Sequence, residues 1–273
     1  MNSENLRHGS RKVKIVAIGT LKGGVGKSTT VVSIASVLAS KGKKVLVLDA
    51  DPQANTTSAF ALDETVAGYK GTLDLFENRH INPSEIIQRT NVDGVDIIGS
   101  TILLTGTERK FSTMAYAEQQ LDRYISRNLE VFNKYDYIIC DTNPSMSKTN
   151  QNVFVTSDKI ICVTDVGISS FKGLELFDYL LDELADEAGL ELQIDGVIVN
   201  RCKNTTNLTK EYIEYLKSKD LTKDIVLDTH IRESVKIAEA ELEQRPVVEY
   251  APQSSVANDF KKLVDELIDK NIL

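Results

Sequence analysis

Short apolar runs alternate along the chain with longer segments whose apolar residues recur at helical spacing. The runs have the composition of buried strands, and they lie at residues 14–19, 45–48, 95–98, 135–141, 159–164 and 196–200. Helical spacing occurs at residues 29–39, 71–76, 116–131, 148–157, 170–187 and 255–268. Strands joined through crossover helices become parallel neighbours. The pattern therefore predicts an α/β fold with a single doubly wound, mainly parallel sheet flanked by helices.

One domain accounts for most of the chain. The sequence has 273 residues, of which 41% are hydrophobic, and this is enough for one large α/β core. We therefore expect a single domain over residues 13–273. Residues 1–12 are polar and carry Arg7, Arg11 and Lys12, so we expect a flexible N-terminal arm ahead of the first strand.

The lengths of the apolar runs and the pattern of cysteines indicate where in the cell the protein is located. No apolar run reaches the roughly 18 residues of a membrane span, and no signal-peptide pattern opens the chain, so we expect a soluble, cytoplasmic protein. The three cysteines include no CxxC pair, which argues against a disulfide framework or a zinc site. Cys140 and Cys162 lie in apolar runs, and we expect both to be buried.

The candidate chemistry centres on residues 20–30, which read TLKGGVGKSTT. This segment follows one predicted strand and precedes a predicted helix, which is the context of a phosphate-binding loop. Glycines let the backbone N–H groups point inward, and the helix N-terminus adds partial positive charge. Lys27 can reach the β- and γ-phosphates, and the Ser28 hydroxyl can bind Mg²⁺. The other loop residues expected to bind the nucleotide are Gly23, Gly24, Val25, Gly26 and Thr29.

Three carboxylates end predicted strands. Asp49 and Asp51 follow the run at 45–48, and Asp141 ends the run at 135–141. Ligands bind at the carboxyl ends of parallel strands, so these side chains should lie near the phosphate-binding loop. Carboxylates there hold metal-bound water or orient the attacking water, and Asp141 has the Walker B pattern of a residue that holds Mg²⁺. The alternative is a set of strand-end turns stabilised by local hydrogen bonds.

Charge alone does not decide whether the chain binds nucleic acid. The formal net charge is −8, and the sequence pI is about 5.1. An acidic protein can bind DNA only through a local basic patch. The lysines in residues 203–223 are interleaved with acidic residues, which favours a solvated helix face there.

Lys22 sets the loop apart, because it adds a second lysine before Lys27. With it, KGGVGKST resembles the deviant Walker A motif of the family that includes the partition ATPases ParA and Soj, the division-site ATPase MinD and the nitrogenase iron protein. The resemblance implies ATP and Mg²⁺ as cofactors. It also implies that Lys22 is a signature lysine, which reaches across an ATP-dependent, nucleotide-sandwiched homodimer to the partner's phosphates.

Two further segments carry the same resemblance. Residues 48–58 look like the family's D-x-D-P-Q segment, which implies that Asp51 positions or activates water and that Asp49 lies just behind the metal ligands. Asn200 and Arg201 end a predicted strand, and the family's Asn-Arg pair at this position reads the N6/N7 edge of adenine. The alternative for Asn200 is an ordinary strand-end asparagine.

The C-terminal region points to one branch of this family. Residues 229–253 resemble the C-terminal segment of partition ATPases, with an alanine-rich helix and a proline-containing turn. Basic residues in that segment help the ATP-bound dimer to bind DNA without reading its sequence. The resemblance therefore assigns DNA contacts to Arg232 and Lys236, and such phosphate contacts are sensitive to salt.

The motifs together favour an ATPase of a plasmid or chromosome partition system. The resemblance implies a Mg²⁺-dependent ATP hydrolase with slow intrinsic turnover and a homodimer that binds double-stranded DNA non-specifically. It also implies a centromere-binding adaptor protein that stimulates hydrolysis, and a location in the cytoplasm on the nucleoid. The sequence does not distinguish plasmid from chromosome cargo.

Three other functions stay open. A MinD-like membrane-associated positioning ATPase would end in a basic amphipathic helix, whereas the polar face of the final helix carries slightly more acids than bases. We therefore expect residues 255–268 to dock on the core and not on a membrane. An iron–sulfur reductase needs loop cysteines, which Cys140 and Cys162 do not supply. A nucleotide-binding switch without useful turnover would carry the same motifs.

Overall fold

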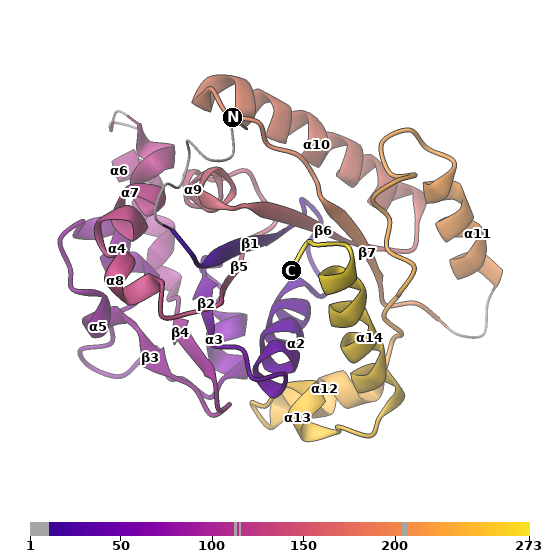
Figure 1. Ribbon diagram of the computed structural model, residues 1–273, viewed down its shortest axis with the longest axis horizontal. Helices are drawn as coiled ribbons and strands as arrows, with labels where there is room; N and C mark the ends of the chain where they lie inside the picture. Colours follow the sequence, from indigo (N-terminus) through magenta and orange to yellow (C-terminus); the bar gives the residue numbers. More distant parts are fainter. Residues whose placement is uncertain (1–10, 112–113, 115, 204–206) are drawn as a thin grey trace.

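A seven-stranded sheet runs through the middle of the molecule, with helices on both faces (Figure 1). The computed structural model describes residues 11–111, 114, 116–203 and 207–273. The strands are β1 (Lys14–Gly19), β2 (Val45–Asp49), β3 (Gln88–Arg89), β4 (Val95–Ile98), β5 (Tyr137–Asp141), β6 (Lys159–Asp165) and β7 (Gly196–Asn200). Their order is β3-β4-β2-β5-β1-β6-β7, and only the β3–β4 pair is antiparallel. The predicted doubly wound, mainly parallel sheet is confirmed; β3 was not predicted.

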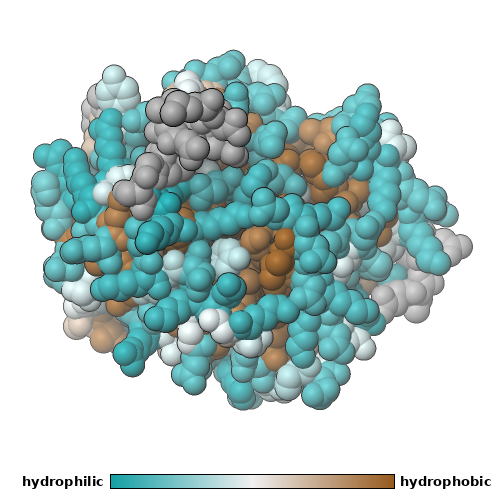
Figure 2. All heavy atoms as spheres, in the orientation of Figure 1, coloured by the Kyte–Doolittle hydropathy of each residue, from teal (hydrophilic) through white to brown (hydrophobic). Residues whose placement is uncertain are grey.

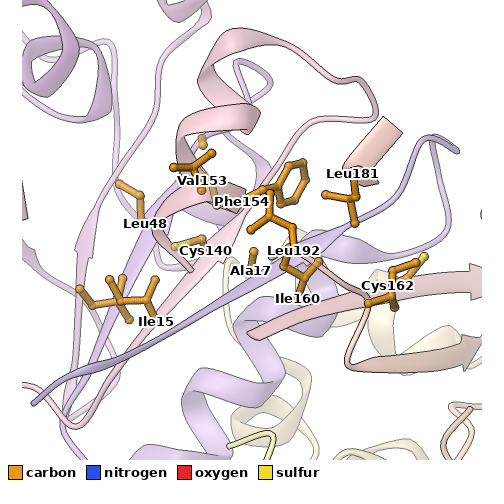
Figure 3. Packing of buried hydrophobic residues seen from close by; sticks show 14 of the residues in the cluster. Ile15, Ala17, Leu48, Cys140, Val153, Phe154, Ile160, Cys162, Leu181 and Leu192 are labelled. Carbon is orange, nitrogen blue, oxygen red and sulfur yellow. The ribbon is translucent and has the colours of Figure 1, made fainter. Parts of the chain in front are cut away.

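Alternating side chains of the sheet feed two separate apolar cores. Along β1, Ile15 and Ala17 point into one core, and Val16 and Ile18 point into the other. This is the period of two that strand geometry imposes. Because both faces are buried, the strands are apolar throughout, as the runs in the sequence indicated. Figure 3 shows the first core around Ala17, where side chains of several strands meet those of the covering helices.

Each core is closed by its own set of helices. One face of the sheet is covered by α2 (Lys27–Ser40), α12 (Val235–Leu242), α13 (Val247–Tyr250) and α14 (Ser255–Asp269). The other face is covered by α4 (Thr72–Glu77), α5 (Pro83–Ile86), α7 (Gln120–Arg127), α8 (Leu129–Phe132), α9 (Lys148–Thr156), α10 (Ile168–Ala188) and α11 (Asn207–Lys217). The remaining short helices are α3 (Asn55–Ala59), α6 (Thr107–Phe111), η1 (Ile102–Gly106) and η2 (Ala117–Gln119).

One predicted helix is divided. The sequence predicted a continuous helix over residues 116–131, but η2, α7 and α8 share this stretch. The break between α7 and α8 falls at Asn128, whose side-chain amide donates to the Tyr124 carbonyl at 2.9 Å. Asparagine side chains that bond nearby backbone groups compete with the regular helix ladder, which explains the interruption.

Both ends of the predicted domain are anchored. Of the predicted arm, residues 1–10 lie outside the described residues. Its last two residues are held, because Arg11 donates to the Thr156 carbonyl at 3.0 Å and the Lys12 N–H donates to Asn133 at 2.8 Å. At the other end, the apolar face of α14 packs on α2, as predicted for the final helix. Hydrophilic side chains cover most of the face of the molecule that Figure 2 shows.

Within the described part of the chain, no helix combines the length and the apolar composition needed to cross a bilayer. The three cysteines are all buried, which confirms the expectation for Cys140 and Cys162.

Neighbouring residues on α10 offer a test of the packing. Phe177 is fully buried and meets Phe154 edge-on at 5.4 Å between ring centroids, whereas Leu176 is 51% exposed. We expect Phe177→Ala to lower the free energy of unfolding by about 3–5 kcal/mol, because it leaves a cavity against β1. Leu176→Ala, on the same helix, should change it by less than about 0.5 kcal/mol. Equal losses in urea denaturation would contradict this packing.

Candidate active site

The loop between β1 and α2 has the conformation of an anion-binding turn. Gly24 and Gly26 have φ angles of 76° and 88°, which are accessible to glycine without strain. A Cβ on Gly26 would lie 2.4 Å from Asn200 Nδ2, so no larger residue fits there. The start of α2 has no side-chain cap and no acidic residue in its first turn. Its first N–H groups are therefore available to a negatively charged ligand.

A cavity of about 580 Å³ opens over this loop. Its lining includes Lys27, Ser28, the loop glycines and Asp51. Residues of α12, of the turn after it and of the start of α13 also line the cavity. Four are apolar and two are charged: Ile237, Ala240, Pro246 and Val247, with Glu241 and Arg245. At the rim, the Thr29 hydroxyl donates to Glu241 at 3.2 Å. The predicted proximity of Asp51 to the phosphate-binding loop is thus observed.

The two lysines of the loop differ in their surroundings. Lys27 is 7% exposed and lines the cavity. Within the described chain, no carboxylate or other acceptor is hydrogen-bonded to its ammonium. Lys22 lies outside the cavity lining and donates to both carboxylate oxygens of Asp165, at 2.8 and 3.0 Å, and to Ser170 at 2.9 Å. One lysine is thus available to a ligand, and the other is paired.

Asp49 and Asp51 do different work at the end of β2. Asp51 accepts from the Gln53 N–H at 2.9 Å and faces the cavity. Asp49 is fully buried behind it, and its carboxylate accepts from the Asp51 N–H at 3.1 Å, the Thr57 N–H at 2.9 Å and the Thr57 hydroxyl at 2.6 Å. Both oxygens of Asp49 are therefore used to fix the turn that carries Asp51.

Asp141 has one free acceptor. It pairs with Asp49 in the register of β2 and β5, and its Oδ2 accepts from the Thr56 hydroxyl at 2.7 Å. Its Oδ1 is buried without a hydrogen-bond partner among the described residues. The Ser28 hydroxyl is near enough to the same carboxylate to lower its pKa. A hydroxyl beside an unpartnered carboxylate oxygen, next to a phosphate-binding loop, fits a Mg²⁺ site.

Burial raises the pKa values of the carboxyl groups of Asp49 and Asp141. Desolvation, with the neighbouring Asp141 charge adding to it, raises the pKa of Asp49 to about 8. Desolvation also raises the pKa of Asp141, although the charge of Lys27 and the nearby hydroxyls of Ser28 and Thr56 oppose it. Lys27 compensates the charge of Asp141 only in part, and a bound cation would favour the charged forms of both carboxyl groups.

Asn200 and Arg201 brace the loop. The Asn200 amide donates to the Val25 carbonyl at 2.8 Å and accepts from the Arg201 N–H at 2.7 Å, and Arg201 donates to the Gly24 carbonyl at 2.8 Å. Asn200 is 2% exposed and does not line the cavity. The sequence predicted that this amide faces adenine; in this structure it faces the loop, because Gly26 allows the strand end to approach closely.

Arg232 and Lys236 are each paired with an acid. Arg232 makes a two-pronged contact with Asp259, at 2.6 and 2.7 Å, and Lys236 contacts Glu239 at 2.7 Å. Lys236 lies in the first turn of α12 and Arg232 lies before the helix, but the structure does not gather them into a patch of unpaired positive charge.

Several residues of the site were not predicted from the sequence. Thr56 and Thr57 fix the carboxylates of Asp141 and Asp49, respectively. Both threonines follow Asp51 in the segment LDADPQANTTS, and this short separation indicates that their hydroxyls can reach the carboxylates at the strand ends. Asp165 had no such signal, since it meets Lys22 from 143 residues away.

Comparison with known proteins assigns the chain to a family. A family model described as an AAA domain matches residues 13–194. The sporulation initiation inhibitor protein Soj of Bacillus subtilis (strain 168) is 31% identical over 254 residues, which cover 93% of this chain and 98% of Soj. The chain belongs to the ParA/Soj family of P-loop ATPases. Membership in the ParA/Soj family brings with it ATP binding and hydrolysis as the general activity.

Other proteins extend the similarity. Cell division protein PomZ of Myxococcus xanthus (strain DK1622) is 28% identical and covers 91% of this chain and 76% of PomZ. A plasmid partition protein from Borrelia burgdorferi B31, crystallised with AMPPNP, has a TM-score of 0.76 at 26% identity and covers 95% of this chain and 100% of its own. Apo McdA from Cyanothece, at 19% identity and a TM-score of 0.81, covers 95% and 99% and shares the ParA/Soj fold.

The paired carboxylates predict a stability effect. We expect Asp141→Asn to stabilise the nucleotide-free protein by about 1–3 kcal/mol, because it replaces a buried negative charge beside Asp49 with a neutral amide. The pKa of Asp49 rises from 3.8 in the unfolded chain to about 8 in the folded one, so the folded state loses stability as pH rises through this window. The gain from Asp141→Asn should therefore be larger at pH 8 than at pH 5.

Thermal unfolding at the two pH values measures this gain. Asp93→Asn is the control, because Asp93 is an exposed carboxylate outside the site and should leave the melting temperature nearly unchanged. Addition of Mg²⁺ should narrow the difference between wild type and Asp141→Asn. A variant that melts below wild type at pH 8 would contradict the repulsion between the two carboxylates.

Proposed function

We propose that the protein is the ATPase of a plasmid or chromosome partition system. The observation that carries this proposal is the cavity in which the phosphate-binding loop, Lys27 and Asp51 meet, with the free oxygen of Asp141 beside it. The relatives named above support the partition branch, because they include a plasmid partition protein of similar structure along the whole chain.

The chain's own residues would divide the work as follows. The loop N–H groups and Lys27 bind the β- and γ-phosphates, and Lys27 stabilises charge on the transferring phosphoryl group. Asp51, which lines the same cavity, orients the attacking water. Ser28 and Asp141 would hold Mg²⁺, which neutralises phosphate charge when it is bound. The activity is then Mg²⁺-dependent.

Three residues, Asp49, Asn200 and Arg201, hold the Asp51 turn and the phosphate-binding loop in place by hydrogen bonds. Asp49 holds the turn of Asp51 through the hydrogen bonds to its backbone and to Thr57. Asn200 and Arg201 hold the carbonyls of the loop, which keeps its N–H groups oriented toward the ligand. The apolar side chains in the cavity lining from α12 and the start of α13, such as Ile237 and Val247, suit the adenine base. Asp49 thus contributes by positioning Asp51, and it is not itself a ligand of the metal ion.

Assembly completes the site in this proposal. Lys22 lies outside the cavity of its own subunit, which supports a role at the phosphates of a second copy in an ATP-dependent homodimer. A site completed only on dimerisation has slow intrinsic turnover. A centromere-binding adaptor protein would then stimulate hydrolysis and release the cargo.

The dimer would bind double-stranded DNA without reading its sequence, in the cytoplasm on the nucleoid. Arg232 and Lys236 are the proposed contacts. The ion pair of Lys236 with Glu239 is partly exposed, so a phosphate can compete for this cation at modest cost. Arg232 pairs with the buried Asp259, so it would contact DNA with the donors that stay free while this pair is kept. Neutralising phosphates with such residues gives salt-sensitive binding.

A gel shift on an arbitrary duplex tests the DNA step. We expect binding with ATP or AMPPNP, little with ADP, none with Lys27→Ala, and a steep loss as salt rises. Lys236→Ala should lower the slope of log affinity against log salt by about one. Lys223→Ala is its matched control, since Lys223 also pairs with an acid three residues away. Absence of binding under ATP, with the dimer intact, would contradict the partition function.

A further inference from the structure

Lys22 has no donor left for another ligand. Its ammonium carries three hydrogens, and three acceptors take them: the two oxygens of Asp165 at 2.8 and 3.0 Å, and the Ser170 hydroxyl at 2.9 Å. The Ser170 hydroxyl in turn donates to Asp165. The three side chains thus form a closed triangle of hydrogen bonds.

The triangle joins three elements at the carboxyl edge of the sheet. Lys22 lies in the loop after β1, Asp165 ends β6, and Ser170 lies in the first turn of α10. Strands β1 and β6 are paired neighbours, which brings the side chains together. Ile168, in the same turn of α10, is 74% exposed, so this edge is open to a partner.

The contact holds the charge of Lys22 away from its own nucleotide cavity. Lys27 and Asp51 line that cavity, but Lys22, Asp165 and Ser170 do not. The side chains of Lys22 and Asp165 are 37% and 25% exposed, so they are accessible from outside without unfolding of the core.

We propose that Asp165 and Ser170 position Lys22 in a latch that must open before the lysine can reach the nucleotide of a second copy of this chain. The inference rests on the ATP-dependent dimer proposed above. Because the ammonium has no spare hydrogen, a contact with the partner's phosphates breaks at least one of these bonds. A triphosphate carries more negative charge than one carboxylate, so it can displace Asp165 where a weaker anion cannot.

The geometry sets the size of the effect. A partly exposed ion pair of this kind corresponds to about fivefold in an equilibrium constant. A symmetric dimer opens two latches, so removing both should tighten the dimer by about 25-fold. An effect of this size shifts the protein concentration at which the ATP-bound dimer forms by about 25-fold.

Asp165→Asn tests the latch, because it removes the charge and nearly keeps the shape. We expect its AMPPNP-dependent dimer dissociation constant, measured by analytical ultracentrifugation, to fall by about 25-fold. Asp228→Asn is the matched control: it makes the same charge change and breaks an ion pair with Lys217 outside the site. Ser170→Ala, which removes one acceptor and keeps the charge, should give an intermediate fall. In a Lys22→Ala background, Asp165→Asn should have no effect.

A second measurement reports on the latch without a dimer. An amine-reactive acetylating reagent, followed by mass spectrometry of the nucleotide-free protein, gives the labelling rate of Lys22. We expect this rate to rise several-fold in Asp165→Asn and to stay at the wild-type value in Asp228→Asn.

The outcomes separate the latch from the proposed function. An unchanged or weaker dimer in Asp165→Asn, with faster labelling of Lys22, would overturn the latch and leave the partition function standing. An unchanged labelling rate would also overturn it. Wild-type protein that fails to self-associate with AMPPNP would contradict the dimer, and with it both the proposed function and the latch.

Discussion

Unbalanced charge at the carboxyl edge of the sheet is the constraint on which the rest of the site depends. The uncapped start of α2 and the buried Lys27 offer N–H groups and an ammonium on one side. The carboxylates of Asp49 and Asp141 meet on the other, buried on adjacent strands. The chain itself compensates neither set fully, since one oxygen of Asp141 has no partner among the described residues. A triphosphate with a divalent cation supplies both missing charges in one ligand.

The order of the strands turns this local chemistry into a site. Because the strands lie in the order β2-β5-β1-β6, the turn of Asp51, Asp141, the phosphate-binding loop and Asp165 follow one another along one edge of the sheet. Two apolar cores hold the strands in this register, so the polar groups at the edge have little freedom. The threonines of the segment after β2 add hydrogen bonds that tie it to both buried carboxylates.

Local patterns explain what could be predicted. The apolar runs located the strands, and the loop with its flanking elements located Lys27 and Ser28, because each signal lies within a short stretch of sequence. Long-range contacts explain the rest. The pairing of Lys22 with Asp165 depends on which strands become neighbours, and no spacing in the sequence encodes it. The Asn200 amide was recognised but expected at the base, and only the three-dimensional approach of the loop shows it bound to the Val25 carbonyl.

Release of inorganic phosphate from ATP tests the central claim most directly, because it asks whether the charges at this edge act on a triphosphate. The account predicts slow, Mg²⁺-dependent release by the wild-type protein, and a loss of at least about 100-fold in Lys27→Ala, which removes the cation aimed at the phosphates. Release that is equal in the two proteins would show that hydrolysis does not use this loop, and would contradict the account.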